Sequence, residues 1–505
     1  MEQSPLYAAV DLGSNSFHLL IVRKVAGQVR IVSRVKRKVR LASGLDSNNN
    51  LSDEAIKRGL DCIRLFAEQL QDVAAENVRI VGTATLRLAA NRDYFVEQAE
   101  RILRHRVEVI SGKREASLIY LGVSVTSSGT GSRLVIDIGG ASTEIVLGHG
   151  YDVSVVNSLP MGCVLWQGRY FSDGIVDSER FSRAVSAAED VVKSVAGQYK
   201  GYSWELCSGA SGTIQALQEI IIAGGGVSEE ITLDLLTKLT ERCIKAGSIS
   251  NIDIPGLVPE RRQVFPSGLS ILTALFRVLG IRSMILSGGA LREGLIAEMV
   301  GFEQRVDARV RTVRSLIERY QLDSAQSERV RTVALSIYDA VKDEWKFGPP
   351  AGRAMLKWAA VLYEIGLCIE YKRAPQHAWY IINNIDMPGF TVPQKQLLSA
   401  LLYNERDSFH LDVLEKQSAV SFSEACRLAR ILRISIIMCM RRSDGTLPDI
   451  KASASGDSLD IRLPGSWLSE HYLRSTELEH EAELQTSMGW PTVICDDQYG
   501  SAPAL

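Results

Sequence analysis

Two short segments of this chain repeat one order of chemical groups: a carboxylate, a glycine and a hydroxyl. Residues 11–16 read DLGSNS, and residues 137–142, 126 positions later, read DIGGAS. Each segment directly follows a short apolar run, which is typical of a buried strand. Gly, Ser and Asn after a strand allow a tight turn whose backbone N–H groups can face a phosphate. Matched offsets favour a duplication over two unrelated strand-to-turn junctions, so the pattern predicts one phosphate chain held from both sides.

Three carboxylates near these turns, Asp11, Asp137 and Glu144, would repel such a phosphate chain. A divalent cation removes the conflict, and hard oxygen ligands favour Mg²⁺, which keeps several waters and bridges carboxylates to phosphate oxygens. The alternative is that the two aspartates cap their turns. Glu144 stands at the register of His18 in the first copy, which indicates that the second turn organises metal or water.

Length and composition set wider bounds. The chain of 505 residues is long enough for three or four domains, and 46% apolar with 23% charged residues is ordinary for a globular protein. A net charge of −2 gives no reason to expect nucleic-acid binding. The sequence holds no apolar run of about 18 residues, so we expect neither membrane insertion nor export. Eight scattered cysteines fit reduced thiols in a cytoplasmic protein.

Strand-like and helix-like patterns alternate up to about residue 302. Strands are expected at 7–10, 17–24, 29–41, 78–82, 107–110, 133–138, 144–147, 152–158 and 283–286, and helices at 52–74 and 92–104, with Ser52 as an N-cap. From about residue 307 helical periodicity dominates, over 310–320, 327–344, 352–369 and 424–440. Alternating residues 458–463 indicate a small terminal sheet.

Several motifs, in order along the chain, resemble those of the exopolyphosphatase / guanosine pentaphosphate phosphohydrolase family: residues 11–18, 82–87, 111–116, 137–144, 159–163, 208–213 and 287–294. The resemblance spans nearly the whole chain. It implies an α/β protein of the actin, sugar kinase and Hsp70 superfamily, with duplicated ribonuclease-H-like domains and the substrate between them. We therefore expect α/β domains at 1–126 and 127–302, a helical HD-like domain at 303–448 and a small C-terminal α+β domain at 449–505.

The resemblance also implies roles for individual residues. Glu115 would be the general base, although a glutamate in a helix first turn is also favoured simply by the helix dipole. Arg87 would contact phosphate, against the alternative of a surface ion pair. The phosphate-binding turns would be Gly13, Ser14 and Asn15 on one side and Gly139, Gly140, Ala141 and Ser142 on the other. Further possible substrate contacts are Arg40, Ser211, Gly212, Arg262 and Arg292.

A basic stripe follows the third expected strand. Arg34, Lys36, Lys38 and Arg40 alternate, so they share one face, while Arg37 points the other way. Such a stripe either draws in a polyanion or is an ordinary solvated face.

In the helical domain, Tyr363 and Glu364 stand where an HD-type metal site needs a His-Asp pair. We therefore expect this domain to be catalytically silent, with His377 a packed or substrate-contacting residue. Arg427, Arg430 and Arg433 are expected on an exposed helix face, with a basic channel or a dimer interface as alternatives.

Both activities of the family cleave a terminal phosphoanhydride, so the substrate must be chosen from details. Ala141 and the stretches 363–366, 374–378 and 386–391 look closer to the guanosine pentaphosphate branch. This implies removal of the 5′ γ-phosphate of pppGpp, giving ppGpp of the stringent response, with exopolyphosphatase activity beside it. The alternatives are a processive exopolyphosphatase acting on long-chain polyphosphate, and a sugar-kinase-like protein or nucleotide-binding sensor of the same fold. A homodimer is a family expectation.

Overall fold

The computed structural model describes residues 4–26, 28–129, 131–224, 230–301, 306–348 and 351–496. The chain divides into two compact units, Met1–Ala308 and Arg309–Leu505. Each unit has its own hydrophobic core and is considered by itself below.

The first unit opens with a five-stranded sheet in the order β3-β2-β1-β4-β5. Its strands are β1 (Leu6–Leu12), β2 (Ser16–Val25), β3 (Gln28–Lys38), β4 (Val78–Gly82) and β5 (Glu108–Val109). The first three run antiparallel to their neighbours, whereas β4 and β5 add in parallel on the other side of β1. The predicted strands are confirmed, although β3 ends at Lys38, three residues before the expected limit.

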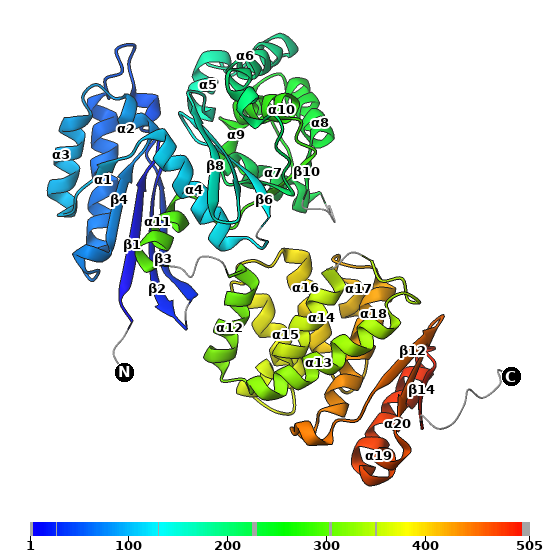
Figure 1. Cartoon of the computed structure of the whole chain (residues 1–505). Helices are drawn as coiled ribbons and strands as arrows, with labels where there is room; N and C mark the ends of the chain where they lie inside the picture. The colour runs from blue at the N-terminus through cyan, green and yellow to red at the C-terminus, as the bar shows by residue number, and fades with distance from the viewer. Residues whose placement is uncertain are drawn as a thin grey trace. The chain divides into compact units, whose positions relative to one another are not determined.

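Helices α1 (Asp53–Gln69), α2 (Ala84–Leu88) and α3 (Arg92–Leu103) lie beside this first sheet (Figure 1). Ser52 caps α1, as predicted, because its hydroxyl accepts from the Ala55 N–H at 3.3 Å. The apolar faces of α1 and α3 are buried in the same core as Phe17 and Leu19 of β2.

A second, six-stranded sheet has the order β10-β11-β9-β6-β7-β8. Its strands are β6 (Ser132–Ile138), β7 (Thr143–His149), β8 (Asp152–Leu159), β9 (Leu206–Gly209), β10 (Ile231–Thr232) and β11 (Ser283–Leu286). Three antiparallel strands are again followed by parallel strands on the far side of the first, so the sheet repeats the order of its predecessor with β10 added at the edge. Its helices are α5 (Cys163–Tyr170), α6 (Ser178–Ala196), α7 (Gly212–Ala223), α8 (Leu233–Ala246), α9 (Pro259–Arg262) and α10 (Phe265–Leu279).

Helices α4 (Gly112–Thr126) and α11 (Leu291–Val300) lie between the two sheets (Figure 1). Two glycines let them cross closely. A Cβ on Gly122 would stand 1.9 Å from the Ala290 carbonyl oxygen, and one on Gly294 would stand 1.9 Å from that of Leu118. Although α11 falls in the range expected for the second domain, it packs against β1 of the first sheet. The crossing therefore links elements of both sheets, because α4 also contacts β7 and β8 of the second sheet.

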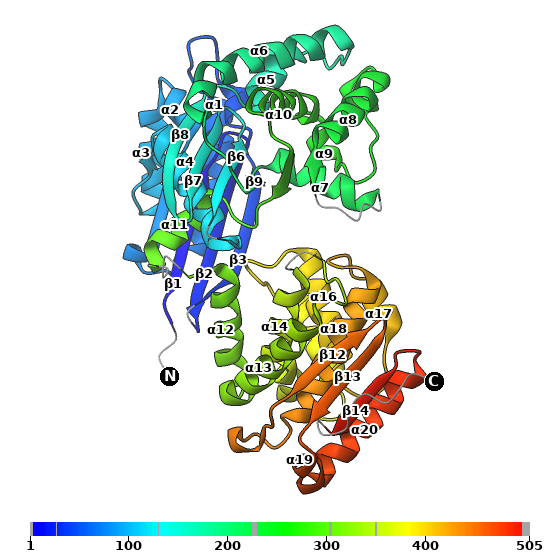
Figure 2. The same cartoon turned by 45° about the vertical axis from the view of Figure 1, so that its right-hand side comes forward.

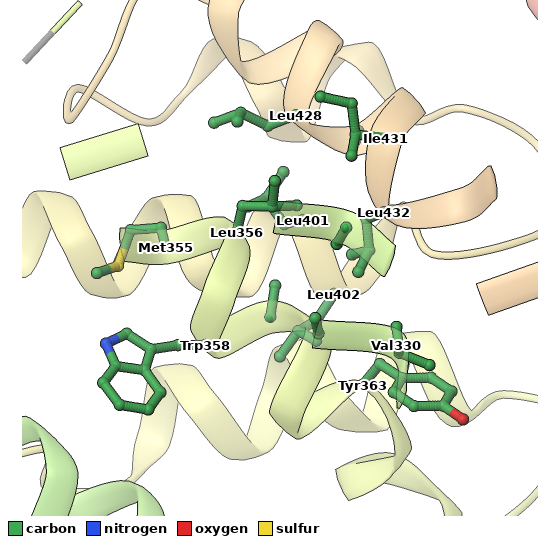
Figure 3. Packing of buried hydrophobic residues seen from close by; sticks show 14 of the residues in the cluster. Val330, Met355, Leu356, Trp358, Tyr363, Leu401, Leu402, Leu428, Ile431 and Leu432 are labelled. Carbon is green, nitrogen blue, oxygen red and sulfur yellow. The ribbon is translucent and has the colours of Figure 1, made fainter. Parts of the chain in front are cut away.

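The second unit is mainly helical, as predicted. It contains α12 (Ala308–Tyr320), α13 (Ser324–Val341), α14 (Ala351–Leu362), α15 (Ala374–Asn384), α16 (Val392–Tyr403), α17 (Leu411–Glu415) and α18 (Phe422–Met438). The helix expected over 352–369 ends at Leu362 and continues as a 3₁₀ helix, Tyr363–Cys368. Leucines of α16 and α18 meet α14 in a packed core (Figure 3). Within the described ranges, none of the helices is long and apolar enough to cross a membrane.

The terminal segment forms a three-stranded sheet, as expected, in the order β12-β13-β14. Its elements are β12 (Lys451–Ser455), β13 (Ser458–Leu463), α19 (Gly465–Glu470), α20 (Tyr472–Ser487) and β14 (Thr492–Asp496), with α20 alongside β14 (Figure 2). The alternating residues Leu459, Ile461 and Leu463 are fully buried in the same core as the helices. The sheet is therefore continuous with the helical core, and the four-part division of the chain stays a proposal.

The prediction of an exposed arginine face on α18 is wrong. Arg430 and Arg433 have exposed fractions of 0% and 3%. Arg433 forms a buried ion pair with Glu481 of α20 at 2.7 Å, and Arg430 donates to Gln485 at 2.9 Å. Arg427, at the rim, pairs with Asp457 at 2.7 Å. The face is covered by segments 27 to 62 residues further along the chain, which helical periodicity alone cannot reveal.

Candidate active site

A cavity of about 470 Å³ lies in the first unit, lined by residues of both repeated turns and by the starts of α4, α7 and α11. The elements that line it come from both sheets, so residues far apart in the sequence share one space.

The two repeated turns face each other across the cavity. Gly13, Ser14 and Asn15 line it on one side, and Gly139, Gly140 and Ser142 on the other. A Cβ on Gly140 would stand 2.8 Å from the Cβ of Ser14, so the turns approach as closely as glycine allows. The predicted Ala141 is buried instead, with an exposed fraction of 2%, and is not among the lining residues of the described chain.

Carbonyl groups of both turns are engaged by neighbouring backbone. The Ala42 N–H donates to the Ser14 carbonyl at 2.9 Å, and the Val164 N–H at the start of α5 donates to the Gly140 carbonyl at 2.9 Å. The Gly139 N–H closes its turn by donating to the Ser142 carbonyl at 2.9 Å, so the remaining N–H groups and the hydroxyls of the turns are left to face a ligand, which is the arrangement that binds phosphate.

Five carboxylates line the cavity. Asp11 and Asp137 are the next-to-last residues of β1 and β6, Glu144 lies on β7, Glu115 on α4 and Glu293 on α11. Burial, reinforced by the charge of Glu115, raises the pKa of both Asp11 and Asp137 to about 7. Burial also raises the pKa of Glu144 well above its ordinary value, despite its hydrogen bond from Ser158 at 2.8 Å.

Glu115 lies in the first turn of α4, where the Ser111 hydroxyl caps the helix by accepting from the Arg114 N–H at 3.2 Å. Its Oε2 accepts from Arg87 Nη1 at 2.6 Å, and the same Nη1 donates to the Ile110 carbonyl at 3.0 Å. Burial raises the pKa of Glu115, and Arg87 opposes that rise. Among the described residues Arg87 is not part of the cavity lining, so its contact is with the carboxylate and not directly with the cavity.

The strand register places the repeated residues in two rows. In the first sheet Asp11 lies opposite His18, which lies opposite Lys36. In the second sheet Asp137 lies opposite Glu144, which lies opposite Ser158. Directly opposed residues share a face of the sheet. The first row therefore contains a carboxylate, a histidine and a lysine, whereas the second contains two carboxylates and a serine.

His18 is uncharged in this setting. Burial, together with the nearby cations Arg292, Lys36, Arg261 and Arg34, lowers its pKa to about 2. Its Nδ1 is buried and has no hydrogen-bond partner among the described residues.

The predicted substrate contacts divide into two groups. Ser211, Gly212 and Arg292 line the cavity, whereas within the described chain Arg40 and Arg262 do not. Arg40 instead has a left-handed backbone, with φ of 52°, and its N–H donates to the Asn15 carbonyl at 2.9 Å. Arg262 pairs with Asp253 at 3.1 Å.

Sequence reasoning missed Arg261, which lines the cavity in place of its neighbour Arg262. A Cβ on Gly212 would stand 1.9 Å from an Arg261 guanidinium nitrogen, so this glycine leaves room for the arginine. Two adjacent arginines on a four-residue helix give no periodicity from which to choose. The close approach of Gly212 is visible only in three dimensions.

A metal site made by the chain alone is not found. Among the described residues, no group of three His, Cys, Asp or Glu side chains is placed to hold a metal ion. Asp11 Oδ1 is nevertheless buried with no hydrogen-bond partner in the described ranges. This carboxylate oxygen lies near Asp137, whose pKa is also raised. The two aspartates fit a hard cation that completes its coordination shell with water and phosphate oxygens.

Comparison with known sequences defines the class of protein. The sequence profile of the Ppx/GppA phosphatase family matches residues 20–303, and that of Ppx/GppA phosphatase domain III matches residues 308–482. The chain therefore belongs to the Ppx/GppA phosphatase family, as the motifs predicted.

Two relatives of this chain carry the same name. The chain is 57% identical over 496 residues to the guanosine-5'-triphosphate,3'-diphosphate pyrophosphatase of Aeromonas hydrophila subsp. hydrophila, covering 98% of this chain and 100% of that protein. It is 48% identical over 491 residues to the protein of the same name from Photobacterium profundum, covering 97% and 98%.

Solved structures support the mixed α/β fold over more than half of the chain. An exopolyphosphatase from Cytophaga hutchinsonii has a TM-score of 0.52 and 23% identity, covering 59% of this chain and 99% of its own. A PPX-GPPA enzyme from Aquifex aeolicus has a TM-score of 0.50 and 24% identity, covering 58% and 99%. Both confirm the mixed α/β fold.

Proposed function

We propose that this protein hydrolyses the terminal 5′ phosphoanhydride of guanosine 5′-triphosphate 3′-diphosphate (pppGpp), releasing ppGpp and phosphate. The observation that carries the proposal is one cavity in which two phosphate-type turns face each other beside Glu115, a carboxylate held by Arg87. Family membership and the 57% identity to a guanosine-5'-triphosphate,3'-diphosphate pyrophosphatase support the choice of substrate.

In this proposal the two turns hold the terminal phosphates. N–H groups of Gly13 to Asn15 and of Gly140 to Ser142 donate to phosphate oxygens, which offsets the charge that repels a nucleophile, while the Gly139 N–H closes its own turn by donating to the Ser142 carbonyl at 2.9 Å. Burial of this site strengthens each of these hydrogen bonds, because little water remains to screen them.

Glu115 then accepts a proton from a water molecule as that water attacks the γ-phosphorus. Arg87 occupies Oε2, and no group of the described chain donates to Oε1, so Oε1 is the atom that receives the proton. The new P–O bond replaces the bond to the bridging oxygen, which leaves with ppGpp. One water is consumed, and phosphate and a proton are released.

Asp11, Asp137 and Glu144 would hold Mg²⁺ in this proposal together with water and phosphate oxygens, because among the described residues no three side chains form a metal site by themselves. When bound, the cation neutralises charge on the phosphate chain and on these carboxylates. The orphaned Oδ1 of Asp11 and the raised pKa values of both aspartates support this assignment, because each is relieved by a neighbouring positive charge.

Four further features belong to the proposal. The matching strand orders of the two sheets support a duplicated ribonuclease-H-like pair of domains of the actin superfamily. The helical unit would be HD-like and catalytically silent, with Tyr363 bound to Gln326 at 3.0 Å and Glu364 paired with Arg442. Eight free cysteines support a cytoplasmic protein. We expect a homodimer. Light scattering that shows a monomer at micromolar concentration would contradict this expectation.

A panel of substrates tests the function. Purified protein with Mg²⁺ is offered pppGpp, long-chain polyphosphate, and ATP with and without sugars, and phosphate release is followed. Rapid release from pppGpp is expected, with polyphosphate as a competing substrate because it ends in the same kind of bond. Release from polyphosphate alone would make the protein an exopolyphosphatase. Turnover that requires a sugar would contradict both hydrolase assignments.

A further inference from the structure

Ser158 on β8 is a polar side chain beside the cavity that no step of the proposed reaction uses. It lies directly opposite Glu144 in the antiparallel pair of β7 and β8. Its hydroxyl donates to Glu144 Oε1 at 2.8 Å. Among the described residues Glu144 lines the cavity and Ser158 does not. Any effect of this hydroxyl on the reaction therefore passes through the carboxylate that it holds.

The other side of Ser158 lies against the start of α4. A Cβ on Gly112, the first residue of that helix, would stand 2.5 Å from both the Cβ and the Oγ of Ser158. Glycine at this position therefore lets the helix backbone rest on the serine side chain. Glu115 follows three residues later, in the first turn of the same helix. One small side chain thus connects the carboxylate of Glu144 with the helix that carries Glu115.

The two glutamates need such a connection because their charges repel each other. Burial, and after it the charge of Glu115, raises the pKa of Glu144, while hydrogen bonds from Ser142 and Ser158 oppose the rise. Glu115 is held by its ion pair with Arg87 at 2.6 Å. Glu144 forms no ion pair in the described part of the chain, so neutral hydroxyl donors hold it instead.

The first sheet has no counterpart of this contact. The residue at the equivalent position of its row is Lys36, which lies opposite His18. Strand pairing uses backbone groups and follows the same antiparallel pattern in both sheets, so it does not require a serine at this place. The serine belongs to the row with two carboxylates, which indicates a role connected with Glu144.

We propose that Ser158 is a positioning residue, which holds the carboxylate of Glu144 at a fixed spacing from Glu115. Its hydrogen bond acts on one side, and its contact with Gly112 acts on the other. The inference rests on the proposed function for the roles of the two glutamates. With this spacing fixed, the terminal phosphate stays in line with the water from which Glu115 takes the proton. Ser158 itself touches neither of them.

Ser158→Ala removes the hydroxyl and keeps the Cβ that contacts Gly112. Steady-state phosphate release from pppGpp at saturating Mg²⁺ should show kcat lowered about tenfold, because a hydrogen bond to a charged group is lost. KM should change less than about threefold, since the turns that hold the phosphates are untouched. Ser154→Ala makes the same change at an exposed position of β8 and should behave as the parent.

A double-mutant cycle shows whether the effect passes through Glu144. In a Glu144→Ala background, Ser158→Ala should cause no further loss of kcat. The same cycle is measured by denaturant unfolding of the full chain without Mg²⁺. There Ser158→Ala should lower the midpoint in the parent and leave it unchanged in Glu144→Ala, so the cycle is decided even where Glu144→Ala has no measurable turnover. Equal midpoint shifts in both backgrounds, including none in either, would overturn the proposal.

Gly112→Ala tests the contact on the other side of the serine. The added Cβ overlaps Ser158, so α4 or the serine must move, and kcat should fall about tenfold although both carboxylates remain. Gly168→Ala, where an added Cβ meets nothing within 4 Å, is the matched control and should keep full activity. A Gly112→Ala enzyme that keeps kcat within about twofold would contradict the role of this contact.

The outcomes separate the positioning role from the function. If Ser158→Ala keeps kcat within about twofold, or raises KM as much as it lowers kcat, the positioning role is overturned and the hydrolase assignment stands. If the parent protein releases no phosphate from pppGpp, the proposed function fails. The same variants assayed with long-chain polyphosphate, together with the unfolding cycle, then still decide the role of Ser158.

Discussion

At the scale of residues, the site depends on a carboxylate, Glu115, whose surroundings have opposite effects on its pKa. Burial of Glu115 favours its neutral form, while the ion pair with Arg87 at 2.6 Å favours the charged form that can accept a proton. Arg87 also donates to the Ile110 carbonyl at 3.0 Å, so its guanidinium is fixed independently of the substrate. Glu115 is thereby oriented before the substrate arrives, which is what a general base needs.

Replacing Glu115 by Gln should therefore abolish proton acceptance and keep the hydrogen bond from Arg87. We expect kcat to fall about 10²- to 10⁴-fold with substrate binding largely intact. Steady-state phosphate release measures the fall in kcat, and calorimetry measures whether substrate binding is retained. Glu108→Gln, an exposed residue on the preceding strand, is the matched control and should behave as the parent. A Glu115→Gln enzyme that keeps kcat within a few-fold would disprove the assignment.

The two aspartates predict a pH dependence of stability. Their pKa values of about 7 in the folded protein exceed the ordinary 3.8, so between pH 4 and 7 the folded state binds more protons than the unfolded state. The free energy of unfolding of metal-free protein should accordingly fall as pH rises through that window and level off above pH 7.

Thermal unfolding at pH 5 and pH 8 in a chelator checks this expectation. Asp137→Asn should raise the melting temperature at pH 8 and weaken the pH dependence, at the expense of activity. Mg²⁺ should stabilise the parent at pH 8 and the variant much less. A parent that is equally stable at both pH values would contradict the pKa assignment.

At the scale of elements, the geometry of the cavity is set by how closely the two turns approach. Gly140 is the limiting position, because an added Cβ would stand 2.8 Å from the Cβ of Ser14 and 3.4 Å from the Asn15 nitrogen. Something must shift to admit even one methyl group, and the atoms that would shift are those proposed to bind phosphate.

Gly140→Ala should therefore lower kcat/KM about tenfold or more with little loss of stability, since a displacement near 1 Å in a catalytic site can cost 10²-fold. The matched control is Gly168→Ala on α5, where an added Cβ meets nothing within 4 Å. That variant should keep full activity and gain up to about 1 kcal/mol of stability, because alanine favours a helix. Equal effects of the two substitutions would show that turn spacing does not matter.

Local patterns in the sequence predicted most elements of the first unit. The apolar runs before Asp11 and Asp137 are strands, and Ser52 caps its helix, because these features depend on residues close in the chain. The repeat also predicted that both turns share a cavity. The choice of Arg261 over Arg262 and the pairing of Arg87 with Glu115 depend on contacts between distant segments, and no local periodicity encodes them.

At the scale of the whole molecule, the second unit depends on charged groups buried where the sequence suggested an exposed face. Arg433 and Glu481 have side-chain exposed fractions of 4% and 5%, and their ion pair joins α18 to α20. The terminal sheet adds Leu459, Ile461 and Leu463 to the same core. The segment after residue 449 is thus bound to the helices by both apolar packing and a buried ion pair.

Arg433→Met should leave Glu481 buried without its cation and with only the hydrogen bond from Gln485 Nε2 at 2.7 Å, and loss of one partner of a buried ion pair typically costs about 3–5 kcal/mol. Denaturant unfolding of the full chain measures this loss. The double variant Arg433→Met with Glu481→Leu should recover most of it, because both charges are then gone. Arg353→Met, which breaks the exposed pair with Asp339 at 2.6 Å, is the control and should cost about 0–1 kcal/mol. Similar losses for Arg433→Met and Arg353→Met would contradict the structural role of the buried pair.

We propose that water attacks the terminal 5′ phosphorus of pppGpp in the cavity between the turns. Reaction in ¹⁸O-labelled water followed by mass spectrometry of both products tests it most directly. We predict one ¹⁸O atom in the released phosphate and none in ppGpp, at a rate that Glu115→Gln lowers at least about 10²-fold. Label in the nucleotide, release of pyrophosphate, or no phosphate release from pppGpp would contradict the account.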